Sequence, residues 1–122
     1  MALGADIYAR LGAVFGGRLY PLALPPELDL GSAASYPCAV YRYDEAGMVP
    51  GLPGSTGSLV LVIWAATPDG LQECKAAVRD MLDGWKQGDV RTCVFESADD
   101  IQDTGTDLFQ GVCRYRVKYM QR

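Results

Sequence analysis

The residues best able to do chemistry are four cysteines, and the chain contains no histidine. No two cysteines are close enough to form a Cys-x-x-Cys motif, and without histidine neither a mixed zinc site nor a Ser-His or Cys-His nucleophile can form. We therefore expect no cofactor, no metal site and no common hydrolase chemistry. In a reducing cytoplasm we interpret the thiols as small buried apolar groups. They are Cys38, Cys74, Cys93 and Cys113.

Three aspartates form the second candidate group: Asp99, Asp100 and Asp103 lie within the acidic segment Ser97–Thr106. Grouped carboxylates can bind a hard cation, but this segment lacks the twelve-residue pattern of a calcium loop. We interpret it as a solvated acidic turn between two strands.

Composition and charge exclude several classes of protein. The 122 residues include 11 basic and 15 acidic side chains, and this acidic balance disfavours general nucleic-acid binding. The longest apolar run, Leu59–Ala66, is far shorter than the roughly 20 residues of a membrane span. Met1–Ala5 carries no basic residue of the kind that opens a secretion signal. We expect one domain, residues 1–122.

Two helices are predicted where apolar residues recur every three or four positions. The first spans Asp6–Phe15, with its first aspartate as the cap and a glycine pair after its end. The second starts at Thr67 and Pro68, because threonine caps a helix and proline fits its first turn. Its apolar stripe continues to Trp85.

Strands are predicted where β-branched and aromatic residues cluster. Leu59–Ala66 is apolar in every position, so we expect it at the centre of a sheet, covered on both faces or covered by a partner chain. The Gly- and Pro-rich segment Asp44–Ser58 is predicted to be a long exposed loop. The predicted strands are Cys38–Tyr43, Leu59–Ala66, Val90–Glu96 and Asp107–Met120, with Arg18–Tyr20 as a short extended piece.

This order of elements predicts an α+β fold. The strands on either side of the long loop should pair as an antiparallel hairpin, and so should the two strands after the second helix. We expect a mostly antiparallel sheet of about four strands, with the two helices packed on one face.

In the last strand, apolar and aromatic side chains alternate with polar and basic ones. Tyr115 and Val117 are expected on the core face, and Arg114, Arg116 and Lys118 on the other. The basic row is either a solvated strand face or a subunit contact that meets the aspartates of a neighbouring copy, where charge complementarity would set the register.

Several segments, taken in order, carry a family likeness that spans nearly the whole chain. They are the N-terminal helix followed by Arg18–Pro21, then Tyr36–Tyr41, Leu59–Ala65, the helix from Leu71 and the terminal strand Asp107–Tyr119. In this ordered set the chain resembles the tail completion or tail terminator proteins of long-tailed bacteriophages, also called tail-to-head joining proteins.

The resemblance implies a structural virion protein and not an enzyme. Proteins of this kind assemble as a hexameric ring on the end of the tail tube, stop its growth and present a surface to the head connector. The implied partners are further copies of the chain, the tail tube protein and the head–tail connector protein. Genome DNA would pass through the ring without sequence-specific binding. The implied location is the head–tail junction of the virion, after synthesis in the bacterial cytoplasm and without a membrane.

Candidate interface residues come from three charged or exposed segments. The long loop is either an ordinary hairpin tip or an arm that reaches the tube or the adjacent ring. The candidates are Asp44, Glu45, Met48 and Leu52 in the loop, Asp99, Asp100 and Asp103 in the acidic segment, and Arg114, Arg116 and Lys118 in the last strand.

Two other classes stay open. One is a different phage connector component, such as a head-closure or minor tail protein. The other is a small enzyme without histidine, for which a cysteine of perturbed pKa in a closed cleft would be the sign.

Overall fold

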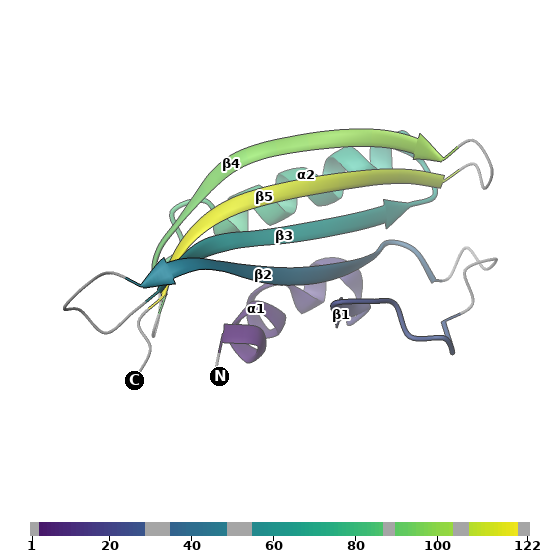
Figure 1. The fold of residues 1–122 in the computed structure, drawn as a ribbon. Coiled ribbons are helices and arrows are strands. Elements are labelled where there is room, and N and C mark those ends of the chain that lie inside the picture. Colours follow the sequence, from purple (N-terminus) through teal and green to yellow (C-terminus); the bar gives the residue numbers. More distant parts are fainter. Residues whose placement is uncertain (1–2, 29–34, 49–54, 87–89, 104–107, 120–122) are drawn as a thin grey trace.

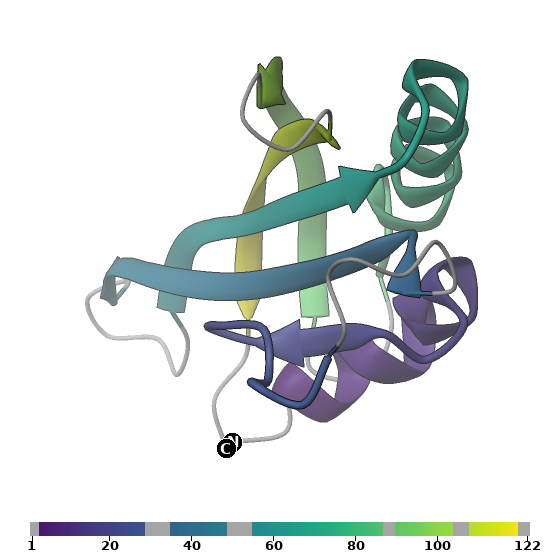
Figure 2. The same ribbon diagram turned by 90° about the vertical axis from the view of Figure 1, so that its right-hand side faces the viewer.

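A computed structural model of the chain describes residues 3–28, 35–48, 55–86, 90–103 and 108–119. In these ranges the two α-helices lie on the same side of a single twisted sheet (Figures 1 and 2). No helix among them is long and apolar enough to cross a membrane. The elements are α1 (Leu3–Leu11), the 3-10 helix η1 (Gly12–Phe15), β1 (Leu19–Pro21), β2 (Cys38–Met48), β3 (Ser55–Ala65), α2 (Pro68–Leu82), β4 (Val90–Asp103) and β5 (Leu108–Tyr119).

The sheet has the strand order β1-β2-β3-β5-β4 and confirms the predicted α+β class. Both predicted hairpins form, because β2 pairs antiparallel with β3 and β4 pairs antiparallel with β5. The sheet has five strands where about four were expected, since Leu19–Pro21 adds to β2 in parallel. Figure 2 shows β4 and β5 turned steeply against β2 and β3, as the normal twist of a sheet requires.

The predicted long loop at Asp44–Ser58 is wrong over most of its length. β2 continues to Met48 and β3 already begins at Ser55. Glycine makes this pairing sterically possible: a Cβ placed on Gly57 would lie 2.4 Å from the backbone oxygen of Asp44. The ladder also shifts register between Glu45 and Gly47, and such a bulge absorbs an extra residue without ending the strand. Residues 49–54 lie outside the described part.

The predicted acidic turn at Ser97–Thr106 is also wrong where the structure describes it. β4 is one strand from Val90 to Asp103, and it pairs with β5 from Val90 to Asp103 with register shifts between Val90 and Thr92 and between Phe95 and Ser97. The aspartates are tolerated in a strand because β4 is the last strand of the sheet, where one face and one edge can meet water.

The helix boundaries differ from the predicted ones at three ends. α1 begins at Leu3, so Asp6 lies in its first turn and is not the cap, and the end of the predicted segment is the 3-10 helix η1. The Thr67 cap is confirmed, because its hydroxyl accepts from the backbone N–H of Gly70 at 3.0 Å. α2 ends at Leu82. Trp85 is still part of the core although it follows the helix.

The core lies between the two helices and one face of the sheet. Helical side chains such as Leu11 and Val78 are completely buried in the same cluster as Leu61 and Ile63 of the central strand. Every second residue of β3 and β5 contributes, as the two-residue period of a strand requires. The further core residues include Ile7, Phe15, Leu59, Leu71, Leu82, Tyr115 and Val117.

The close approach at Gly57 makes a testable prediction about the hairpin. We expect Gly57→Ala to lower the free energy of unfolding by about 1 to 3 kcal/mol, because the added methyl group must push β2 away from β3. Denaturant unfolding measures this loss. Ser58→Ala, one residue further along β3, is the control and should stay within about 0.5 kcal/mol of the parent chain. A Gly57→Ala protein as stable as the parent would show that the pairing at this point is different.

Candidate functional site

The face of the sheet opposite the helices carries side chains that do not belong to the core cluster. We call it the open face, and in Figure 1 it is the side of the sheet away from α2. Along β3 it carries Val60, Val62 and Trp64, which alternate with the residues of the core cluster; neighbouring side chains bury Val60, and Val62 and Trp64 are half-buried. No helix covers this face in the described ranges, as the prediction of both helices on one face requires. The predicted central position of β3 is confirmed, and cover of its second face by a partner chain stays a prediction.

The open face changes from apolar at one end to basic at the other. At the apolar end Val62 lies opposite Val112, and both are half-buried. Further along, Ser58 lies opposite Arg116 and Thr56 opposite Lys118. This surface therefore offers a partner both apolar contact and positive charge.

The basic row of β5, which consists of Arg114, Arg116 and Lys118, lies on the face of the sheet opposite the core, as the sequence predicted. Arg114 and Arg116 are exposed, whereas Tyr115 between them is fully buried. The guanidinium of Arg114 lies 3.8 Å from Asp99, and that of Arg116 lies 3.8 Å from Glu96. Exposed pairs at this distance contribute little to stability, so the cations stay available to another chain. Lys118 has no ion pair within the described residues.

The structure separates two aspartates that the sequence placed in one cluster. Asp99 lies opposite Val112 on the open face, whereas Asp100 lies opposite Gly111 on the helix side. There Asp100 accepts hydrogen bonds from Lys75 at 2.5 Å and Gln72 at 2.8 Å. The hydrogen bond from Lys75 is the main reason that the pKa of Asp100 is lowered. Successive strand residues point to opposite faces, which is why a cluster cannot form here.

The remaining sequence candidates lie in or beside the β2–β3 hairpin and at the end of β4. Asp44 is exposed in β2 and forms an ion pair with Arg42 at 3.0 Å. Glu45 and Met48 are strand residues of β2, and Asp103 ends β4, but their side chains lie outside the described part. Leu52 lies outside it altogether. No group of three metal-binding side chains occurs among the residues that the structure describes.

Sequence reasoning missed three exposed apolar side chains. Val94 and Ile101 are each 53% exposed on the open face of β4, and Leu22 after β1 is 74% exposed. Leu22 also has a φ of 68°, a conformation that costs energy for a side chain of this size. The sequence feature that could have indicated this exposed apolar surface was Ile101, a large apolar residue within an otherwise polar run.

At both edges of the sheet, only some of the outward backbone N–H and C=O groups have a hydrogen-bond partner within the described residues. On β4 the carbonyl of Cys93 accepts from the backbone N–H of Gly84 at 2.7 Å, and the N–H of Phe95 donates to Asp83 at 3.1 Å. Beyond Phe95, no backbone bond from the described residues reaches the outer edge of β4. On the other side, β1 covers β2 only at positions 39–41. Free strand edges can accept a strand from another chain.

The four thiols do not form a reactive site. All four cysteines are free and buried, as predicted. Burial raises the pKa of the Cys38 thiol to about 11 and that of Cys93 to about 12, and it also raises the pKa of Cys74 and Cys113. A nucleophilic cysteine needs the opposite shift, toward the thiolate.

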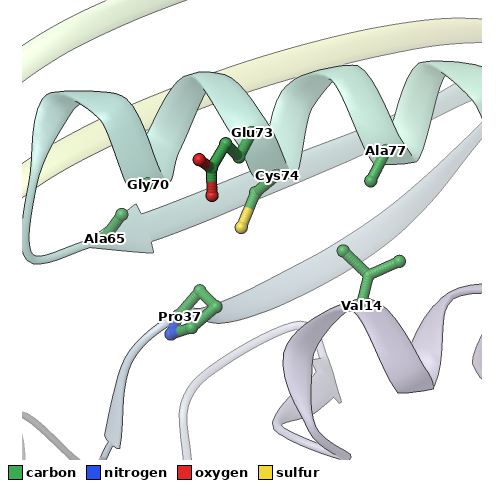
Figure 3. Close-up of a pocket in the computed structure, with 7 residues that line it drawn as sticks. All are labelled: Val14, Pro37, Ala65, Gly70, Glu73, Cys74 and Ala77. Atoms are coloured by element: carbon green, nitrogen blue, oxygen red, sulfur yellow. The ribbon is translucent and has the colours of Figure 1, made fainter.

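A pocket of about 360 Å³ lies between α2 and η1 (Figure 3). Cys74 of α2 and Val14 of η1 project into it from opposite sides, and Pro37 lies below. Glu73 supplies the only charge among the lining residues. With so little polar lining, this pocket holds no arrangement that could orient a reacting group.

Comparison with known proteins was consistent at the level of family and fold. The family model described as "Tail completion protein gp17" matches residues 5–120. Among solved structures, a chain of a "Virion of native gene transfer agent (GTA) particle" is 22% identical, with a TM-score of 0.68 over 97% of this chain and 88% of that chain. No curated protein sequence matches.

The Asp100 contacts predict a pH-dependent contribution to stability. Because the pKa of Asp100 is lowered in the folded chain, its contribution is present above the unfolded pKa near 4 and is lost as the pH falls through the folded value. We expect Asp100→Asn to lower the free energy of unfolding by about 1 kcal/mol at pH 7, with the half-exposed position limiting the effect.

The measurement is denaturant unfolding of parent and variant from pH 7 down to pH 2. Asp99→Asn is the control, because the same change on the open face removes only a 3.8 Å pair and should cost close to nothing. A difference for Asp100→Asn that persists unchanged at pH 2 would contradict the assignment.

Proposed function

Because the chain belongs to the Tail completion protein gp17 family, we propose that it closes the end of a phage-like tail as a hexameric ring and joins that tail to the head connector. Family membership makes the chain a component of the virion tail. The ring, its subunit number and the joining role are the proposal. The fold shared with a chain of a gene transfer agent virion supports it.

The observation that carries the ring is the pair of partly free edges on one sheet. The two edges differ, since one is the second half of β4 and the other is the part of β2 beyond Tyr41. A contact between two different surfaces is heterologous, and it gives a closed ring when the rotation between neighbours closes. An edge-to-edge contact would also remove the aggregation hazard of free strands.

The two free edges lie at opposite ends of the sheet, which constrains how copies could join. The strand register pairs Ile101 of β4 with Gln110, Gln110 with Trp64, and Trp64 with Cys38. Ile101 therefore lies in the same row across the sheet as Cys38, at the start of β2. The free part of β2 begins only beyond Tyr41. Joining these edges would shift each copy along the strand direction relative to the next. A shift of this kind tilts the strands, as in closed barrels.

The charges on the open face supply a second support. Arg114, Arg116 and Lys118 are exposed cations, while Asp99 and Asp44 are exposed acids on the strands that carry the two edges. In the proposed ring the cations of one copy meet the acids of the next, which fixes register more than it adds affinity. We assign the remaining interface candidates either to the same contact between copies or to a contact with the tail tube. They are Glu45, Met48, Leu52 and Asp103. Asp100 takes no direct part, because Lys75 of its own chain holds it.

An enzymatic function has no comparable support. The described thiols are buried with raised pKa, and the chain has no histidine. A different connector role, such as head closure, would use the same sheet edges. The position of the protein in the particle distinguishes that role from closure of the tail.

The ring is tested by reversing one charge. We expect the parent chain to show six times its monomer mass in native mass spectrometry, and Arg116→Glu to weaken the assembly at least tenfold because it faces the neighbour's acids with a like charge. Lys86→Glu, an exposed charge outside the basic row, is the control and should assemble normally. Unchanged assembly of folded Arg116→Glu would remove the basic row from the interface.

The joining role is tested in particles that lack the protein. We expect tails of uncontrolled length without heads, and restoration of normal particles when the parent gene is supplied. Electron microscopy of negatively stained particles measures both. Normal tails attached to heads in the absence of the protein would overturn the proposed function.

A further inference from the structure

A second pocket, of about 290 Å³, lies between α2 and the strands β4 and β5. Figure 1 shows α2 passing behind these two strands. Gln72, Lys75, Ala76 and Arg79 line the pocket from the helix. The strands contribute Phe95, Ala98, Cys113 and Tyr115. Its lining therefore combines apolar walls with polar groups, unlike that of the pocket beside η1.

A buried hydroxyl at this pocket has no partner. Tyr115 is fully buried, and its hydroxyl makes no hydrogen bond within the described part of the chain. Buried polar groups are nearly always hydrogen-bonded, so such a hydroxyl calls for an explanation. Burial also raises the pKa of Tyr115, which keeps the phenol protonated and able to donate.

Arg79 provides unused donors at the same pocket. Its guanidinium lies over the ring of Phe95, 4.2 Å from the ring centre, and this stacking holds it in place while leaving its N–H groups free. No hydrogen bond or ion pair of the Arg79 side chain occurs within the described ranges. The Arg79 charge lowers the pKa of Tyr115 against the larger effect of burial, so the two groups are within electrostatic reach.

The two cations of the lining differ in their partners. Lys75 forms an ion pair with Asp100 at 2.5 Å, whereas no carboxylate among the described residues lies within ion-pair distance of Arg79. The nearby Asp83 carboxylate accepts instead from the backbone N–H of Phe95 at 3.1 Å. A single free positive charge suits a ligand with one negative charge better than a doubly charged phosphate.

We propose that this pocket binds a carboxylate on a short aliphatic stem. The Arg79 guanidinium and the Tyr115 hydroxyl donate hydrogen bonds to the carboxylate oxygens. The planar guanidinium matches the planar carboxylate. Ala76, Ala98 and Phe95 surround the stem. The carboxylate comes either from a small free acid or from an acidic side chain of a neighbouring copy.

Butyrate is the probe for binding, and butyramide is its uncharged counterpart. We expect calorimetric titration of the parent protein to show butyrate binding at least tenfold tighter than butyramide. Arg79→Gln and Tyr115→Phe should each weaken butyrate binding at least tenfold, while Arg91→Gln, a change at an exposed arginine outside the pocket, should not.

Thermal unfolding without butyrate separates lost binding from lost structure. Tyr115→Phe removes a hydroxyl that has no partner, so its Tm should equal or exceed that of the parent. A Tm that falls by several degrees in this variant would show that the hydroxyl is already satisfied and would overturn the proposal.

The oligomer distinguishes the two sources of the carboxylate. If Arg79→Gln weakens assembly and Arg91→Gln does not, an acidic side chain of a neighbouring copy fills the pocket. If the parent binds butyrate and Arg79→Gln leaves assembly unchanged, the ligand is a free acid. If butyrate does not bind and Arg79→Gln assembles normally, the pocket inference fails while the proposed ring stands.

Discussion

Burial on one side of the sheet is the constraint on which the rest of this structure depends. Both helices pack on the same face, and their side chains fill a single core with every second residue of β3 and β5. A sheet of this kind leaves its second face and its edges to solvent or to other chains. The open face, with Trp64 and Val62 at one end and a basic row at the other, is the direct consequence.

The chemistry of the side chains agrees with a protein whose work is assembly. The groups that could react are protected, since the thiols are buried with raised pKa. Exposed charges instead gather along β4 and β5, and exposed apolar side chains such as Ile101 lie beside them. Surfaces that combine apolar area with a charged rim are typical of contacts between proteins. Membership of a tail completion family fits this arrangement.

The pocket between α2 and the end strands depends on the same packing. Because α2 lies across β4 and β5, one face of it places Lys75 beside Asp100 and Arg79 over Phe95. Gly111 makes room for this, since a Cβ there would lie 2.9 Å from Leu71.

The sequence by itself determined whatever depends on neighbours along the chain. The cap at Thr67, the periodicity of α2 and the alternation of Tyr115 with Arg114 and Arg116 are local patterns, so they were predictable. Only the tertiary structure decided how far strands extend, because the partner strand sets that length: pairing with β3 extended β2 through Gly47 to Met48, and pairing with β5 extended β4 to Asp103. The same pairing put neighbouring aspartates on opposite faces of the sheet.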